Sequence, residues 1–258
     1  GLMLGYALWR FVLLRDVLAF KRMWWLFLSG FVEPVFYLFS IGIGLGALVN
    51  DVTTDQGMVI SYAAFVAPAM LAASAMNGSI ADTTYNFFAK LKFSKTYDTM
   101  LATPARPWDV AIGEILWSLI RGGVYSAIFF VVALAMGFVR SWWAVLAIPA
   151  ALLIGAAFAG VGMWATTYMR SWKDFEFVTL VIQPMFLFSA TFFPLAVYPE
   201  SLQWLVKVMP LYHGVELQRG LLLGDMHGGL VVSVLYLVVL CALGLWGASR
   251  RISRLLLT

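Results

Sequence analysis

Charged side chains are scarce in this sequence. Asp, Glu, Lys and Arg make up 12% of its 258 residues, whereas 62% are hydrophobic and the mean hydropathy is +0.89. Soluble domains are about a quarter charged and about half apolar. This composition excludes an ordinary soluble domain and indicates a protein whose surface faces lipid over much of its area.

Cysteine and histidine are also rare in this sequence, and the usual nucleotide-binding motif is absent. The single cysteine, Cys241, excludes a disulfide within the chain and a cysteine cluster for zinc. His213 and His227 are isolated from each other, so we predict no metal site and no catalytic residues. The sequence contains no G-x-x-x-x-G-K-[ST], the loop that cradles nucleotide phosphates. We therefore expect neither an enzyme nor a cofactor site on this chain.

Long apolar runs occupy most of the chain. A helix needs about 20 apolar residues to cross the hydrocarbon layer, so the length allows about six such helices with short loops. The predicted fold is therefore all-α and polytopic, with residues 1–258 forming one transmembrane domain. The six predicted spans are residues 24–48, 58–80, 110–137, 142–168, 176–193 and 228–248.

The basic residues gather on one side of the predicted membrane. Thirteen of them lie before the first span, in residues 82–109, in residues 169–175 or after the last span. The opposite side holds only Arg140, Lys207 and Arg219. The positive-inside rule then places both termini in the cytoplasm, which requires an even number of spans. Orientation in the membrane also explains the formal charge of +4 better than nucleic-acid binding does, so no nucleic-acid partner is expected.

Residues 6–22 contain four basic residues just before the first span, so they are predicted to lie outside it. Helical spacing places Trp9, Leu13, Val17 and Phe20 on one side, although Asp16 interrupts that side. We expect an interfacial helix that lies along the cytoplasmic surface of the membrane.

Two connections are too long to be simple turns. Residues 82–109 mix aromatic and charged side chains on the cytoplasmic side, a pattern that predicts at least one short amphipathic helix. Residues 194–227 on the outer side are divided by Pro194, Pro199 and Pro210. Apolar pieces separated by prolines predict short or re-entrant helices before the last span, with ends satisfied by protein or water.

Four ionisable residues fall in or next to predicted spans: Glu33, Asp82, Glu114 and Arg121. Such groups are costly in a membrane and usually face protein or a water-filled cavity. Glu114 and Arg121 lie about 10 Å apart along one helix face, too far to touch directly, so each needs another partner. Arg121 is expected to pair with Asp82 or across a subunit interface, or to line a path for an anionic cargo. Glu33 is expected to pair with basic residues at the cytoplasmic boundary or to contact cargo.

Small and aromatic residues mark two further features. Gly42 with Gly46, and Gly155 with Ala159 and Gly160, have spacings that permit close helix contact, including contact between two copies. Phenylalanines crowd the outer end of the fifth predicted span, where they either form a wall for an acyl chain or pack against lipid and core. These residues are Phe186, Phe188, Phe192 and Phe193.

Four segments together resemble a known family: PVFYLFSIGIGLGALV (34–49), SYAAFVAPAMLAASAM (61–76), TYDTMLATPARPWDVAIGEILW (96–117) and PLYHGVELQRGLLLG (210–224). They are similar to the permeases of type-2 ABC exporters, in the NodJ-like and DrrB-like branches, and the likeness runs from about residue 6 to the C-terminal tail. Where that family leads us to expect a glutamate before the cytoplasmic coupling helix, this chain has Asp82.

The resemblance implies a permease in the cytoplasmic membrane of a prokaryote, surrounded by membrane lipids. It implies a second permease, identical or paralogous, and two copies of an ATP-binding subunit that holds ATP and Mg. The NodJ-like branch implies export of lipo-oligosaccharide, and the DrrB-like branch implies efflux of amphipathic drugs. The alternative function is a secondary transporter or channel driven by an ion gradient. That class commonly shows inverted repeats, and no internal repeat is visible in this sequence.

The segment 82–109 is the expected contact with the ATP-binding subunit, because a short helix with aromatic and basic side chains suits a groove on a partner. The residues expected to make that contact are Tyr85, Phe87, Phe88, Lys90 and Lys92. The alternative is an ordinary interfacial helix held by lipid headgroups. The outer segment 194–227 is expected to act as a gate.

Overall fold

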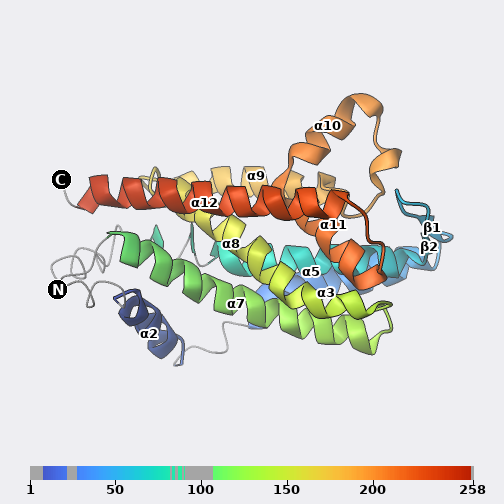
Figure 1. The fold of residues 1–258 in the computed structure, drawn as a ribbon, viewed down its shortest axis with the longest axis horizontal. Coiled ribbons are helices and arrows are strands. Elements are labelled where there is room, and N and C mark those ends of the chain that lie inside the picture. Colours follow the sequence, from blue (N-terminus) through green and yellow to red (C-terminus); the bar gives the residue numbers. More distant parts are fainter. Residues whose placement is uncertain are drawn as a thin grey trace.

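A computed structural model describes residues 8–21, 28–81, 83–84, 87–88, 90 and 107–256. This part of the chain is mostly helical (Figure 1). The helices are α2 (Trp9–Phe20), α3 (Leu28–Tyr37), α4 (Gly44–Gly46), α5 (Tyr62–Ala81), α7 (Pro107–Ala135), α8 (Ala147–Thr166), α9 (Phe175–Phe188), α10 (Glu200–Val208), α11 (Pro210–Leu223) and α12 (Gly229–Leu256). A π-helical turn, Leu38–Ile43, joins α3 to α4, and three 3-10 turns cover Trp142–Leu146, Trp172–Asp174 and Leu195–Val197.

Four helical stretches in the described residues are long and apolar enough to cross a membrane. They are Tyr62–Ala81, Asp109–Ala135, Trp142–Thr166 and Gly229–Leu255, and they correspond to four of the six predicted spans. The polytopic, mostly helical fold is thereby confirmed. The count of six is not, because the first predicted span contains a shorter apolar helix, Val32–Gly46, and α9 has only 14 residues.

The fifth predicted span ends earlier than expected. The prediction extended it to residue 193, but α9 stops at Phe188 and the next five residues form bends. Ala190 has a φ of 57°, in the left-handed region, which is uncommon for a residue with a side chain and ends the regular helix. Apolar character alone does not reveal this break, so the predicted boundary was wrong.

The most buried helix is α5, and the other helices are arranged around it. α7, α8 and α11 pack directly on α5, and α12 packs mainly on α8. Of the four candidate spans α5 is buried over 83% of its apolar window and α12 over only 22%. α5 is therefore the central helix of the bundle, whereas α12 leaves a broad apolar face outside.

Close packing between α8 and α12 depends on glycine. A Cβ added to Gly244 of α12 would overlap the backbone of Gly160 and Val161 on α8. The small residues on α8, which the sequence suggested for contact between two permeases, thus serve contact within the chain. Gly42 likewise faces α5, where an added Cβ would lie 3.7 Å from Ala63.

A small β-hairpin was not predicted from the sequence. β1 (Val52–Thr53) pairs antiparallel with β2 (Val59–Ile60) in the connection before α5. The turn between them uses Gly57 at a φ of 90°, which favours glycine. In Figure 1 this hairpin lies at one end of the molecule, and α2 with the last turns of α12 lies at the other. We call these the hairpin end and the α2 end.

Candidate functional site

The first candidate site is a cluster of four charged side chains at the α2 end. We call it the α2–α7 charge cluster, and its members are Arg15 and Asp16 on α2, Lys90, and Glu114 on α7. Three segments spread over about a hundred residues of sequence thus meet at one point. The cluster is the place where the predicted interfacial helix, the predicted coupling segment and a long membrane helix come together.

Positively and negatively charged side chains alternate in the cluster. Lys90 Nζ lies 2.8 Å from Asp16 Oδ1 and 3.0 Å from Glu114 Oε2. Arg15 Nη2 donates to Glu114 Oε1 at 2.8 Å and also contacts its neighbour Asp16. The two carboxylates are almost completely buried, whereas Arg15 and Lys90 are partly exposed. Each buried carboxylate therefore has cationic partners, as burial of a charge requires.

A glycine lets α2 approach α7 closely beside the cluster. A Cβ on Gly113 would come within 2.5 Å of Val12 Cβ and 2.9 Å of the Trp9 carbonyl oxygen. Real Cβ atoms do not approach so closely, so α2 can lie in this position only because residue 113 has no side chain. The backbone of α2 is thus held directly against the membrane helix that carries Glu114.

The structure corrects the predicted orientation of the interfacial helix. The buried residues of α2 are Val12 and Asp16, which face α7, and not the side that carries Leu13 and Val17. The outward residues Phe11, Leu14 and Leu18 are apolar and exposed. The helix is present as predicted. Asp16, which interrupts the predicted apolar side, is the residue that points to protein. The outward apolar face is the one suited to lipid.

Phe87 and Phe88 in the predicted coupling segment are both fully buried within the chain. Phe88 makes edge-on contacts with Trp172 and Phe175, with ring centroids 5.0 and 5.1 Å apart. Phe87 packs in a separate cluster that includes Ile115 of α7, together with residues of α8 and α12. These two rings anchor the segment to the helices, so they do not present a surface to another protein here. Tyr85, Lys92 and Asp82 lie outside the described residues.

The other predicted polar residues are placed separately. Arg121 Nε donates to the Tyr125 hydroxyl at 3.0 Å, one turn along α7. Its suggested partner Asp82 lies outside the described residues. Glu33 is exposed on α3, and no described residue forms an ion pair with it. Among the described residues Glu114 forms ion pairs with Arg15 and Lys90, and the ion pairs between described residues do not join it to Arg121.

A second candidate site at the hairpin end is organised by Arg219 of α11. This arginine is almost fully buried. Its guanidinium donates to the carbonyl oxygens of Phe65 at 3.0 Å, Ala190 at 3.1 Å and Thr191 at 3.4 Å. It also lies 3.7 Å from the centroid of the Phe65 ring, a cation–π contact. One side chain thus joins α11 to α5 and to the irregular backbone that follows α9.

The hairpin holds the same region from the other side. Asp55, in the turn between β1 and β2, accepts hydrogen bonds from the backbone N–H groups of Leu195 at 3.2 Å and Ala196 at 3.1 Å. The Thr54 hydroxyl donates to Asp225 Oδ2 at 3.3 Å. The hairpin therefore contacts both ends of the segment that was predicted to be a gate. We call these contacts, with those of Arg219, the hairpin-end clamp.

Glu216 is the carboxylate nearest to Arg219 within the clamp. Its Oε1 is 3.8 Å from Arg219 Nη1, and its Oε2 is 3.9 Å from His227 Nε2. Burial raises the pKa of the Glu216 carboxyl above its usual value, and the charge of Arg219 opposes part of that rise. Proton uptake by Glu216 therefore occurs at higher pH than in a free glutamate.

His213 of α11 joins α10 to α12. Its Nε2 donates to the Lys207 carbonyl oxygen at 2.7 Å, which leaves Nδ1 to accept from the Ser233 hydroxyl at 3.1 Å. Burial lowers the pKa of His213, which favours this neutral form. The Tyr236 ring stacks on the imidazole at 4.1 Å.

The structure divides the four predicted cargo-path phenylalanines into two pairs. Phe186 and Phe192 are buried and contact each other edge-on at 5.7 Å, beside the ring of Tyr37. Phe188 and Phe193 are half exposed. The first pair packs the core next to the end of α9, and the second pair faces outward.

Sequence reasoning missed the roles of Arg219 and Asp55. Arg219 was counted only as one of three basic residues on the outer side. The sequence did contain a signal: an arginine in a largely apolar segment is almost never fully buried without partners, so partners for Arg219 could have been expected. Asp55 gave no such signal, since an aspartate in a turn is common without any distant contact.

Comparison with known proteins completes the description. The model of the family described as ABC-2 type transporter matches residues 7–223. Nodulation protein J of Rhizobium leguminosarum bv. trifolii is 36% identical over 221 residues, which cover 84% of this chain and 80% of that protein. Nodulation protein J of Rhizobium meliloti (strain 1021) is 34% identical over 234 residues, or 89% and 86% of the two chains.

Proposed function

Because this chain belongs to the ABC-2 type transporter family, we propose that it is the membrane-spanning permease of an ATP-driven exporter. Permeases of this family are membrane subunits that work with an ATP-binding subunit and are not enzymes on their own. In this proposal ATP and Mg are held by two copies of a separate ATP-binding chain in the complex. A second permease, identical or paralogous, completes the pathway.

The observation that carries the proposal is the α2–α7 charge cluster. Lys90 belongs to the segment 82–109, which we propose as the contact for the ATP-binding subunit, and its ammonium is held by carboxylates on α2 and α7. A displacement of that segment would pull on Glu114, which sits near one end of α7. α7 runs 29 residues, about 44 Å, so it reaches from the α2 end to the hairpin end.

At the hairpin end the proposed output is release of the clamp. Arg219 and Asp55 hold the backbone at residues 190–196 through four hydrogen bonds, to main-chain groups of Ala190, Thr191, Leu195 and Ala196. Arg219 also donates twice to the carbonyl oxygen of Phe65 on α5. Opening a path there requires these bonds to be exchanged for others. We propose residues 194–227 as the gate for this reason, with the hairpin end outside and both termini in the cytoplasm.

The proposed cargo is amphipathic: a lipo-oligosaccharide, a glycolipid or a hydrophobic drug. The relatives bear the name nodulation protein J, which supports an exported molecule of a symbiotic bacterium rather than one particular structure. The exposed Phe188 and Phe193 are the proposed contacts for its apolar part, since they face outward beside the gate.

Purification of the chain from its own membrane in mild detergent tests this function. We expect an ATP-binding protein to co-purify in fixed stoichiometry, and mass spectrometry of the same sample reports whether a second permease is present. A folded chain that repeatedly purifies without any ATP-binding protein would contradict the proposal and favour a gradient-driven transporter.

A further inference from the structure

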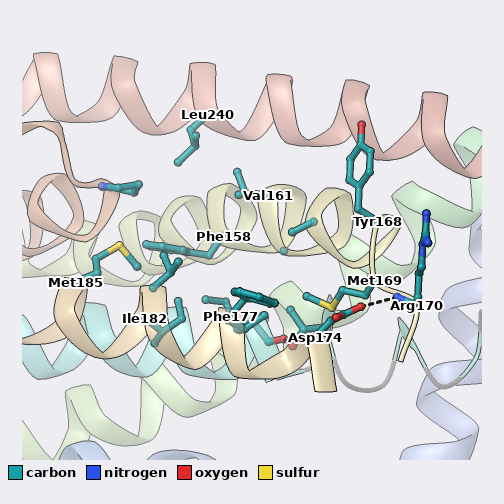
Figure 2. Close-up of a pocket in the computed structure, with 17 residues that line it drawn as sticks. Phe158, Val161, Tyr168, Met169, Arg170, Asp174, Phe177, Ile182, Met185 and Leu240 are labelled. Carbon is teal, nitrogen blue, oxygen red and sulfur yellow. Dashed lines mark hydrogen bonds between the residues drawn. The ribbon is translucent and has the colours of Figure 1, made fainter. Parts of the chain in front are cut away.

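A cavity of about 760 Å³ lies between α8, α9 and α12, away from both candidate sites (Figure 2). Its long walls are apolar: Phe158 and Val161 of α8 face Phe177 and Ile182 of α9, and Leu240 of α12 points toward them. Cavities that hold ligands in proteins measure about 300–1,000 Å³. The volume of this cavity falls within that range.

Only one end of the cavity is polar. Figure 2 shows Tyr168, Arg170 and Asp174 at that end, which is the α2 end, while Met185 and Phe158 lie farther along. The opposite end reaches Pro210, at the start of α11. A molecule that matches this surface has a polar group at one end and a long apolar body.

The polar mouth carries more positive than negative charge. Asp174 Oδ2 accepts hydrogen bonds from the backbone N–H groups of Arg170 at 2.8 Å and Ser171 at 3.4 Å, so the loop itself uses this carboxylate. The Arg170 side chain is exposed and forms no ion pair with any described residue. A cation at the mouth is therefore available to a ligand.

A second cation stands beside the same mouth. The Arg251 guanidinium of α12 lies 4.1 Å from the centroid of the Tyr168 ring, and its Nη2 donates to the Thr167 carbonyl oxygen at 3.4 Å. Its Nε is buried, and no described residue accepts a hydrogen bond from it. Two arginines and a single carboxylate used by the backbone favour an anionic group at this end.

We propose that this cavity binds an anionic phospholipid of the surrounding membrane, with an acyl chain along the apolar walls and the phosphate at Arg170 and Arg251. Apolar walls offer water few hydrogen-bond partners, and an empty cavity would forfeit the dispersion contacts of its walls. Phe177 and Val181 on the rim of the cavity are exposed, so an acyl chain from the bilayer can enter beside them. The inference requires only that the chain spans a membrane and does not depend on the proposed export.

The acyl chain fills space, and the headgroup provides the selectivity. Lipid tails are about as apolar as the cavity walls, so moving a chain from bilayer to cavity changes little hydrophobic free energy. Basic residues at a membrane surface each favour anionic lipid by about fivefold in binding. The two parts of the proposal therefore respond to different substitutions.

Native mass spectrometry of the full chain tests both parts. The chain is reconstituted in vesicles of equal palmitoyl-oleoyl phosphatidylglycerol and phosphatidylcholine, extracted, and washed with detergent in steps. We expect one phosphatidylglycerol per chain to persist. Ala165→Phe on α8, which fills the cavity, should reduce retention at least fivefold, whereas Val239→Phe, on the exposed face of α12, should not. Equal retention by wild type and Ala165→Phe would overturn the proposal.

The headgroup part is tested by Arg170→Gln with Lys173→Gln as its matched control. Both remove one positive charge from the same loop, but only Arg170 lines the cavity. Arg170→Gln should reduce the preference for phosphatidylglycerol about fivefold, and Lys173→Gln should leave it unchanged. Equal retention of both lipids by wild type would contradict the anionic headgroup.

A second measurement uses only the wild-type chain, so it tests the proposal even if the variants do not fold. Phosphatidylglycerol with a diazirine on its acyl chain is photolysed in vesicles that contain the wild-type chain. Adducts should be enriched at Val161 and Phe177 over Val239, which is also lipid-exposed but lies outside the cavity. Uniform labelling would overturn the proposal. Two further results would overturn it: a wild-type chain purified from native membrane that retains a non-phospholipid cargo, and a permease dimer that retains no lipid.

Discussion

Lys90 and Glu114 form an ion pair of 3.0 Å between a segment outside the membrane spans and the longest described helix. The same ammonium also reaches Asp16, so one cation serves two buried carboxylates. Removing one partner of a buried pair costs more than the pair itself contributes, because a charge is left without compensation. This relationship makes the α2–α7 charge cluster the most direct place to perturb coupling.

Lys90→Met should destabilise the folded chain by about 1–3 kcal/mol, since it leaves Asp16 and Glu114 with Arg15 as their described cationic partner. In the double variant Lys90→Met with Glu114→Gln, the cost should be smaller than the sum of the two single changes by about 1 kcal/mol. Detergent-denaturation curves measure both quantities. Strictly additive effects would show that the two side chains do not interact.

Gly113→Ala should displace α2 from α7, because the new Cβ would lie within 2.5 Å of Val12 Cβ. We expect easier proteolysis of the N-terminal segment and lower thermal stability. Gly44→Ala is the matched control, since a Cβ there meets nothing within 4 Å. If both variants behaved like wild type, the close docking of α2 would be refuted.

Arg219→Met should cost about 3 kcal/mol, because buried carbonyl groups of Phe65 and Ala190 lose their donor. Cysteine accessibility at Phe193→Cys should rise as the backbone beside it loosens. Arg140→Met, at an exposed position, serves as the control and should change neither quantity. Unchanged stability in Arg219→Met would remove the arginine from the clamp.

Glu216 gives the chain a pH dependence whose sign follows from its raised pKa. A carboxyl with a raised folded pKa adds stability that is fully present below its unfolded pKa and is lost as pH rises through the folded value. Wild type should therefore lose more stability than Glu216→Gln as pH is raised from about 4, the usual pKa of a glutamate, through the raised pKa of Glu216. Thermal unfolding over that range measures the difference, with exposed Glu200→Gln expected to follow wild type. Parallel curves for wild type and Glu216→Gln would contradict the assignment.

The long spans were predictable because their signal is local. α5, α7, α8 and α12 each contain enough consecutive apolar residues to cross a bilayer, whatever surrounds them. The end of α9 was not predictable. The carbonyl groups of Ala190 and Phe192, just beyond the helix, accept hydrogen bonds from Arg219 and Tyr62, which are distant in sequence. The apolar residues after Phe188 resemble a continued helix in the sequence.

The candidate sites depended still more on tertiary contacts. Spacing along α7 correctly indicated that Glu114 and Arg121 are not partners, but nothing local indicated Arg15 or Lys90. Phe87 and Phe88 were expected to pack against the ATP-binding subunit, because aromatic character indicates a packing surface without revealing which protein supplies the other side. In the structure that other side is the chain itself.

Transport in inverted membrane vesicles tests the central claim most directly. Vesicles that contain the chain and its ATP-binding partner are given a fluorescent amphipathic glycolipid, with ATP or with an ion gradient alone. The account predicts accumulation that requires ATP, persists when ionophores collapse the gradients and falls in Lys90→Met. Accumulation without ATP that disappears with ionophores would contradict it.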